Sequence, residues 1–197
     1  ATVEAEAILV ATGRKPYTEG LNLDRIGVET NRTGIVTNDN MQTNLNHIYA
    51  IGDVNGRQML AHAATFQGRR AVNHILGKTD NIRLDIMPAA VFTRPEAASV
   101  GPTADFCKAN NIPFTAHKAV YRANGRAQAM EQTDGLVKII LDDNDRIIAC
   151  HAFGADAAAI VQEVSALMNF DVTRQQLSNI VHIHPTLSEI LLDAARH

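Results

Sequence analysis

The first part of the chain alternates short apolar runs with turns and ends in a helical pattern. Residues 7–11 and 47–51 are largely apolar, and a glycine turn follows each run. Such a run before a tight turn is typical of a buried strand. From about residue 58 to residue 76 the apolar positions recur with helical spacing, and Gly77 follows as a stop. We therefore expect two strands and a helix, followed by a polar linker over residues 78–85.

A second region, which Pro88 opens, mixes extended and helical patterns. Two apolar runs flank the turn residues Asp142 to Asp145, which predicts a hairpin. The predicted strands cover residues 90–93, 114–122, 136–141 and 146–153. The predicted helices cover residues 103–110, a stretch capped by Asp156, a stretch from about Thr173, and the last residues from Ile190. Strands followed by helices indicate an α+β fold, with an antiparallel sheet and helices packed on it.

The composition argues against several classes of protein, namely nucleic-acid-binding, membrane-spanning and disulfide-rich proteins. The chain has 197 residues, of which 46% are hydrophobic, and this suffices for one or two domains with a core. The net charge of −3 gives no basic face, so we expect no nucleic-acid partner. No apolar run approaches the ~20 residues that span a membrane. Two cysteines, Cys107 and Cys150, predict a reducing, cytoplasmic compartment rather than a disulfide scaffold, with Cys150 as a buried strand residue.

The candidate chemistry lies near the end of the chain, in the segment His-Ile-His-Pro-Thr-Leu-Ser-Glu over residues 182–189. Histidine exchanges protons near neutral pH, and a carboxylate bonded to one ring nitrogen fixes the tautomer and stabilises the imidazolium. His184 and Glu189 are therefore candidates for an acid/base dyad. A structural interpretation is also open, in which Glu189 completes a capping box with Thr186. Spacing alone favours this structural interpretation. His182 and His184 could together bind a metal, but no third ligand is evident, so we expect none.

Three motifs together resemble one enzyme family. Residues 184–189, His-Pro-Thr-Leu-Ser-Glu, are similar to a signature of the flavin disulfide reductases. Residues 47–54 and 59–62 resemble the second flavin-binding segment of that family, and residues 11–16 resemble the strand end that closes its nicotinamide-binding domain. The motifs follow the family's order, and the resemblance covers essentially the whole chain. The sequence is thus similar to the class I pyridine nucleotide-disulfide oxidoreductases, above all to their dihydrolipoamide dehydrogenase branch.

The resemblance implies roles for residues near the predicted helix start. Asp53 would hold the ribityl chain of FAD, and the amide of Ala61 would lie against the flavin ring, with Met59, Leu60 and His62 around it. Free amides and the positive end of the helix dipole suit a ring that becomes an anion on reduction. Without the resemblance, Asp53 would be a turn residue, Met59 and Leu60 would be helix core, and His62 would be a structural histidine.

Several of the family's motifs are absent from this sequence. It contains no G-x-G-x-x-G for FAD or NAD, and its two cysteines are too far apart for the family's redox pair. We therefore expect the C-terminal part of a longer enzyme, with an incomplete piece of an α/β FAD/NAD-binding domain before the α+β dimerisation domain. Residues 1–18 would end the NAD-binding domain, and Gly13 would let its backbone approach a nicotinamide nucleotide closely. Residues 19–86 would be the last segment of the FAD-binding domain, and residues 87–197 the dimerisation domain with the dyad.

The resemblance also implies an activity. Electrons would pass from a dithiol to an enzyme disulfide, then to FAD and to NAD, while His184 takes a proton from the substrate thiol and Glu189 orients it. The parent enzyme would bind FAD and NAD, pair with a second copy of itself, and act on a small dithiol or disulfide or on a lipoyl domain. Glutathione-type reductases share the His-Pro dyad, so the identity of the disulfide stays open. For this piece alone, which we expect to bind no cofactor, the alternative is a catalytically silent dimerisation module.

Overall fold

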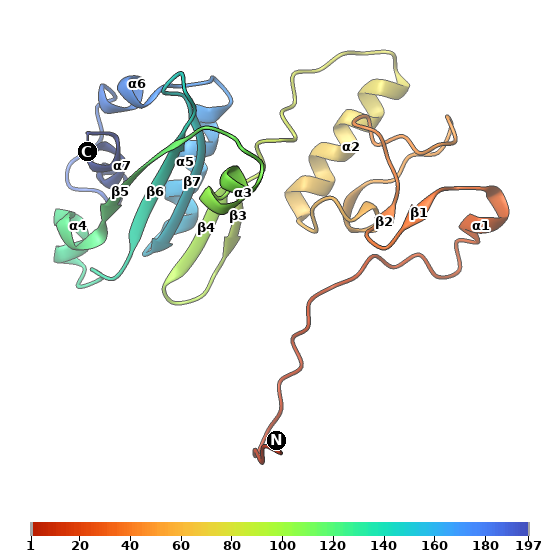
Figure 1. Cartoon of the computed structure of the whole chain (residues 1–197), viewed down its shortest axis with the longest axis horizontal. Helices are drawn as coiled ribbons and strands as arrows, with labels where there is room; N and C mark the ends of the chain where they lie inside the picture. Colours follow the sequence, from red (N-terminus) through yellow and green to blue (C-terminus); the bar gives the residue numbers. More distant parts are fainter. Residues whose placement is uncertain (1, 197) are drawn as a thin grey trace. The chain divides into compact units, whose positions relative to one another are not determined.

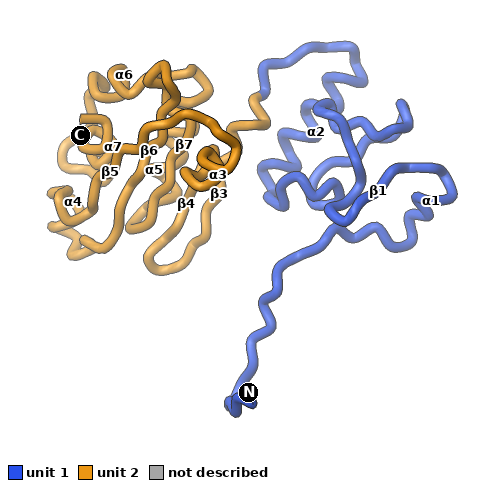
Figure 2. Tube along the Cα trace, in the orientation of Figure 1, with its two compact units in different colours: residues 1–82 blue, residues 83–197 orange. Residues whose placement is uncertain are grey.

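The computed structural model describes residues 2–196 and divides the chain into two compact units, residues 1–82 and residues 83–197 (Figure 2). Each unit has its own cluster of buried apolar side chains. The flavin-side candidates lie in the first unit, and the dyad lies in the second.

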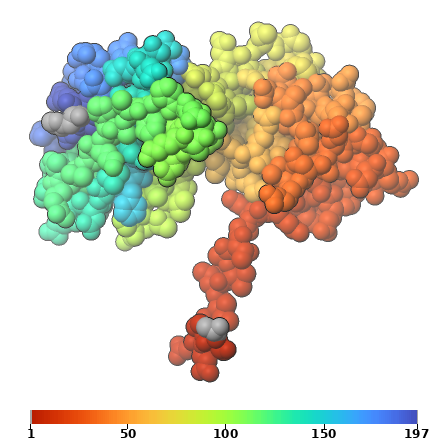
Figure 3. All heavy atoms as spheres, in the orientation of Figure 1, coloured from red at the N-terminus to blue at the C-terminus, as the bar shows by residue number. Residues whose placement is uncertain are grey.

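The first unit has few regular elements. An extended segment at its N-terminal end projects from the rest of the unit (Figure 3). Its elements are helix α1 (Leu23–Ile26), the antiparallel strands β1 (Thr30–Asn31) and β2 (Gly34–Ile35), the 3-10 turn η1 (Gly52–Asn55) and helix α2 (Ala61–Ile75) (Figure 1). Helix α2 confirms the helix predicted from the apolar spacing. A small cluster of Val28, Ile35 and Ala50 is buried at the centre of the unit.

The two strands predicted in this unit do not form. Residues 7–11 belong to no strand, and Ile8, Leu9 and Val10 are exposed. Of residues 47–51, only Tyr49 makes an isolated bridge, with Gln42. A buried strand needs neighbouring strands for its backbone hydrogen bonds, and no segment within residues 2–196 pairs with residues 7–11. The apolar pattern shows that these runs are hydrophobic. It does not show whether a neighbouring strand is present to pair with them.

The predicted linker over residues 78–85 is polar, but its first half is held on α2. Asp80 Oδ1 accepts a hydrogen bond from Arg70 Nε at 2.9 Å, and its Oδ2 accepts one from Asn73 Nδ2 at 2.9 Å. Arg70 Nη2 also donates to the carbonyl of Ile82 at 2.6 Å. The bond from Asn73 is the largest cause of a lowered pKa of the Asp80 carboxyl. These contacts fix the end of the first unit.

The second unit is built on a five-stranded antiparallel sheet with the order β3-β4-β7-β6-β5. The strands are β3 (Ala89–Val91), β4 (Glu96–Val100), β5 (Thr115–Val120), β6 (Leu136–Leu141) and β7 (Ile147–Gly154). The predicted hairpin is confirmed as β6–β7, and Asp142 Oδ1 closes its turn by accepting from the amides of Asn144 and Arg146 at 2.9 Å each. Strand β4 of this sheet was not predicted from the sequence pattern.

Two helices cover one face of this sheet and confirm the α+β arrangement. Helix α5 (Ala157–Met168) packs on β4 and β7, and helix α7 (Ile190–Arg196) packs on β5 and β6 (Figure 1). Ile160, Val164 and Leu191 from these helices are buried in the same core as sheet residues. The shorter elements are α3 (Ala104–Ala109), η2 (Tyr121–Ala123), α4 (Gly125–Ala129), α6 (Arg174–Ser178) and η3 (Leu187–Glu189). Within residues 2–196, no helix is both long and apolar enough to cross a membrane.

The start of α5 differs from the prediction. Asp156 occupies the N-cap position with a φ of 52°, but its side chain makes no capping hydrogen bond. Instead, the carboxylate of Glu96 on β4 accepts a hydrogen bond from the backbone amide of Ala158 at 3.2 Å. An acidic side chain from a distant strand thus satisfies an amide of the first helical turn, which local sequence cannot reveal.

Candidate functional site

His184 lies in a loop between two short helices of the second unit, and Glu189 lies in η3 just after that loop. We call residues 179–186 the dyad loop; it follows α6 and leads into η3 and α7. A capping box begins α6, where Thr173 Oγ1 accepts from the amide of Gln176 and Gln176 Oε1 accepts from the amide of Thr173. The helix predicted from Thr173 is therefore confirmed, although it is only 5 residues long. The dyad loop starts where this helix ends.

The structure brings His184 and Glu189 into direct contact. Nδ1 of His184 lies 2.9 Å from Oε1 of Glu189. The other carboxylate oxygen, Oε2, accepts a hydrogen bond from the backbone amide of Thr186 at 2.8 Å. The dyad and the cap are therefore not alternatives, because each uses a different oxygen of one carboxylate.

This geometry determines what His184 can do. A carboxylate only accepts hydrogen bonds, so the proton of a neutral imidazole lies on Nδ1 and leaves Nε2 as an acceptor. The His184 side chain is 79% exposed, whereas that of Glu189 is only 25% exposed. The pKa of the Glu189 carboxyl is lowered, first by the hydrogen bond from the Thr186 amide and then by that with His184. The site thus combines an ionised, fixed carboxylate with an accessible base.

Two polar contacts hold the end of the dyad loop. Thr186 Oγ1 donates to the carbonyl of Ile183 at 2.7 Å. The carbonyl of Thr186 accepts a hydrogen bond from Nδ2 of Asn124 at 3.1 Å. Asn124 is buried and also caps α4 by accepting from the amide of Ala127 at 3.0 Å. Sequence analysis missed Asn124, because its partner in the loop is 62 residues away.

His182 makes contacts of its own rather than joining His184. Its Nε2 lies 2.9 Å from Oε1 of Glu163 on α5, and its Nδ1 lies 3.0 Å from the carbonyl oxygen of Ile180. Neither ring nitrogen is left for the metal site that the spacing of two histidines could have formed. Glu163 is a further residue that the sequence analysis missed, since no local motif connects it to the dyad.

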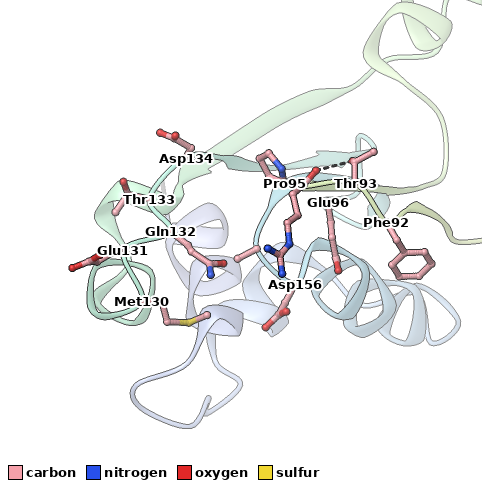
Figure 4. A pocket seen from close by; sticks show the side chains of 12 residues that line it. Phe92, Thr93, Pro95, Glu96, Met130, Glu131, Gln132, Thr133, Asp134 and Asp156 are labelled. Atoms are coloured by element: carbon pink, nitrogen blue, oxygen red, sulfur yellow. Dashed lines mark hydrogen bonds between the residues drawn. The ribbon is translucent and has the colours of Figure 1, made fainter. Parts of the chain in front are cut away.

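Two neighbouring cavities share lining residues, and the smaller one lies beside the dyad loop. One of about 380 Å³ is lined by Pro185, Thr186, Leu187 and Ser188 on one side. A larger one of about 700 Å³ reaches from the turn between β3 and β4 to the start of α5 (Figure 4). Met130 and Asp156 line both. The surface next to the dyad is therefore hollowed rather than filled by the described side chains.

The first unit places the flavin-side candidates around the start of α2. Asp53 lies exposed in η1, and Leu60 is the residue before α2 begins at Ala61. Met59 and Leu60 are half-buried rather than fully in a core, and His62 is exposed on the first turn. The first turn of α2 contains no acidic residue and Leu60 offers no side-chain cap, so the positive end of the helix dipole is not neutralised by these groups.

Two hydrogen bonds organise this part of the first unit. Arg14 Nη2 donates to the carbonyl of Met59 at 3.2 Å, which joins the extended segment next to Gly13 to the start of α2. Gly13 itself has a φ of 90°, which favours glycine. Gln67, buried on α2, accepts a hydrogen bond from the Gly52 amide at 2.8 Å and so fixes the turn that contains Asp53. Sequence analysis missed Gln67, whose contact joins residues 15 apart.

The two cysteines are both buried. Cys107 lies on α3, and Cys150 lies on β7, as predicted for a buried strand residue. Burial raises the pKa of the Cys150 thiol to about 12, and the charge of Glu163 adds to this effect. Because the thiolate is the reactive form, we expect Cys150 to be unreactive in the folded chain.

Comparison with known families identifies the chain. Residues 87–195 match the dimerisation domain of the pyridine nucleotide-disulphide oxidoreductases, and residues 1–68 match a second model of the same family. The chain therefore belongs to the pyridine nucleotide-disulphide oxidoreductases, a family of flavin- and nicotinamide-dependent enzymes. This confirms the family that the three sequence motifs indicated.

Several individual members of this family are similar to the chain. The mitochondrial dihydrolipoyl dehydrogenase of Pisum sativum is 39% identical over 98% of this chain, which covers 39% of that protein. The dihydrolipoyl dehydrogenase of Bacillus subtilis is 38% identical over 98% of this chain and 42% of its own length. Among solved structures, LpdA of Mycobacterium tuberculosis matches 92% of this chain and 40% of its own with a TM-score of 0.84 and 31% identity. The chain thus spans about two fifths of the length of the relatives it matches.

Proposed function

We propose that this chain is the C-terminal part of an FAD-dependent, NAD-linked disulfide oxidoreductase of the dihydrolipoamide dehydrogenase type. In this enzyme His184 is the acid/base group and Glu189 its orienting carboxylate. The observation that supports this most directly is the 2.9 Å contact between His184 Nδ1 and Glu189 Oε1, which leaves an exposed Nε2 as the base. The similarity to dihydrolipoyl dehydrogenases favours a dithiol as the substrate.

The chemistry of this chain is proton transfer. Nε2 of His184 takes the proton of a substrate thiol, and the resulting thiolate is the nucleophile for a disulfide. Glu189 stabilises the imidazolium that forms, because its carboxylate stays ionised and fixed by the Thr186 amide. His184 later returns the proton to a leaving thiolate. The disulfide under attack lies outside this chain, whose two cysteines are both buried.

The start of α2 fits a flavin. Its first turn has no acidic side chain, and its dipole end favours negative charge. The Ala61 amide with Met59, Leu60 and His62 would lie against the ring, and Asp53 would bind the ribityl hydroxyls. FAD supplies the two-electron acceptor between the dithiol and NAD, and Gly13 would lie close to the nicotinamide nucleotide. This chain has only part of such a site, so we expect the isolated chain to bind neither cofactor.

The dyad also needs a second protein surface. Val181 and Ile183 alternate with the two histidines in the dyad loop and are 95% and 80% exposed, respectively. Apolar side chains so exposed next to an exposed base are suited to burial against a partner. We therefore propose that residues 87–197 form a two-fold homodimer and that the partner subunit provides the flavin and the disulfide that His184 faces.

A single substitution tests the role of His184. In the complete enzyme, His184→Gln should lower dithiol oxidation about 10²- to 10⁴-fold, since the acid/base group is lost. Hydride exchange between NADH and the flavin should persist, because it needs no substrate thiol. Near-normal dithiol turnover in the variant would rule out the role. A complete wild-type enzyme that exchanges hydride but oxidises no dithiol would contradict the proposed substrate class.

A further inference from the structure

A second histidine–carboxylate pair lies beside the dyad and has no part in the proton transfer proposed above. His182 Nε2 lies 2.9 Å from Glu163 Oε1, and Nδ1 lies 3.0 Å from the carbonyl oxygen of Ile180. The His182 side chain is only 4% exposed, although it is two residues from the exposed His184. The His182 ring is therefore held on both sides within the protein.

Both groups that face the ring nitrogens of His182 are acceptors. A backbone carbonyl and an ionised carboxylate can only accept hydrogen bonds. Both contacts are hydrogen bonds at once only when both ring nitrogens bear a proton, which is the imidazolium form. Glu163 supplies the matching negative charge. When both hydrogen bonds are made, the pair is an ion pair whose histidine end is buried.

The dyad loop has few other attachments along this stretch. Between residues 181 and 184, no backbone amide donates to a backbone carbonyl in the described part of the chain. The loop is attached to the rest of the unit by the bond from Asn124 to the Thr186 carbonyl at its end and by the contact of the His182 ring with Glu163 in its middle. Glu163, by contrast, lies on the 12-residue helix α5. Ile160 and Val164 of the same helix are buried in the core. The ion pair therefore joins a loop with few bonds to a rigid element.

We propose that His182 and Glu163 are positioning residues, whose ion pair fastens the dyad loop to α5 and so fixes the orientation in which His184 meets its substrate. His184 is the second residue after His182, so a loop that releases the His182 ring would also displace His184. A displacement of about 1 Å in a reacting group can lower a rate by about 10²-fold. The catalytic consequence deepens the proposed function and rests on it.

The two pairs are also linked by charge. The pKa of the Glu189 carboxyl is lowered mainly by the Thr186 amide and by His184, and the positive charge of His182 adds to the same direction. Neutralising His182 would therefore weaken the ionised state of the dyad's carboxylate as well as free the loop. The His182 ring is in addition in direct contact with α5 through Glu163.

Ring nitrogen NMR of the chain tests the positioning without any cofactor. In the wild type, both nitrogens of His182 should resonate as protonated, and neutral His184 should be predominantly the Nδ1–H tautomer. Glu163→Ala should shift His184 toward a mixture of tautomers, and Glu163→Gln, which keeps the shape but removes the charge, should do so more weakly. His151→Gln is the matched control, since His151 is a half-buried histidine bonded to the carbonyl of Pro102 at 3.0 Å, away from the dyad loop. It should leave His184 unchanged.

Kinetics of the complete enzyme test the consequence. Glu163→Ala and His182→Gln should each lower kcat for dithiol oxidation about 10- to 100-fold, with KM changed less than about twofold. Folded variants with an unchanged His184 tautomer and unchanged kcat would overturn the proposal and leave the pair a purely structural role. If instead the wild type oxidises no dithiol, the proposed function fails, while the NMR comparison still decides whether the pair positions His184.

Discussion

Replacing Glu189 with glutamine separates the two contacts of its carboxylate. The Thr186 amide can only donate, so the oxygen of the new amide group must face Thr186. The amide nitrogen then faces His184 Nδ1, which must accept, and the imidazole proton moves to Nε2. The variant therefore keeps the cap but inverts the tautomer of His184, and the exposed nitrogen can no longer accept a thiol proton.

The sizes of the two effects differ widely. At the cap, a neutral acceptor replaces a charged one, which changes a hydrogen bond of about 1.5–3 kcal/mol into one of about 0.5–1.5 kcal/mol. Because the Glu189 side chain is 25% exposed, solvent reduces the difference, and we expect a loss of about 0.5–1 kcal/mol in unfolding free energy. A wrong tautomer should lower dithiol turnover about 10²- to 10⁴-fold, or about 3–5 kcal/mol in the barrier.

The stability effect should depend on pH. Folding lowers the pKa of the Glu189 carboxyl, so its contribution is fully present above the pKa of an unfolded glutamate and is lost as the pH falls through the lower folded value. Glutamine does not titrate. The difference in unfolding free energy between wild type and Glu189→Gln should therefore be largest at neutral pH and shrink below the usual range of a glutamate.

Urea unfolding and turnover per folded enzyme measure the two effects separately. Asp193→Asn, the same charge change in the first turn of α7, is the control for turnover and should leave dithiol oxidation nearly unchanged. Near-normal dithiol turnover in Glu189→Gln would refute the argument that Glu189 sets the tautomer of His184. A Glu189→Ala variant as stable as the wild type at neutral pH would refute the capping contribution.

Three further outcomes follow from the structure. A Cβ added to Gly154 would lie 2.5 Å from the buried ring of Tyr121 at a φ of 145°, so Gly154→Ala should lower the unfolding free energy by about 2–4 kcal/mol in urea titrations, and no loss would contradict this packing. Cys150 should resist alkylation at pH 8 until the chain is unfolded, because burial raises its pKa to about 12; rapid labelling of the native chain would contradict this. The purified isolated chain should show no flavin absorption, and a stoichiometric yellow chromophore would refute that expectation.

Elements that depend on neighbouring residues were predictable from the sequence. The spacing of Ile160, Val161 and Val164 predicted α5, and the run of turn residues after Leu141 predicted the β6–β7 hairpin. The dyad belongs to this group, because His184 and Glu189 are only 5 residues apart and a short turn brings them together. Both the catalytic and the capping hypotheses could be stated from the same segment for that reason.

Features that depend on distant partners were not predictable. Residues 7–11 have the composition of a buried strand, but hydrogen-bond partners decide whether a strand forms. The cap of α5 comes from Glu96, 62 residues before the amide it accepts from. The contact between His182 and Glu163 spans 19 residues and joins a loop to a helix face. No local pattern indicates such pairs. The sequence therefore predicted the pairing of His184 with Glu189 but not the contact of His182 with Glu163.

We propose His184 as the acid/base group of a site that a second subunit completes. Mixed dimers of the complete enzyme test it, with one subunit bearing His184→Gln and the other lacking a redox cysteine. Each mixed dimer then contains one site with both an intact disulfide and an intact dyad, provided that the dyad acts across the interface. We expect about half of the wild-type dithiol turnover in verified mixed dimers, whereas each parent variant alone should be nearly inactive. No recovery in those dimers would contradict it, because the dyad would then act within its own subunit.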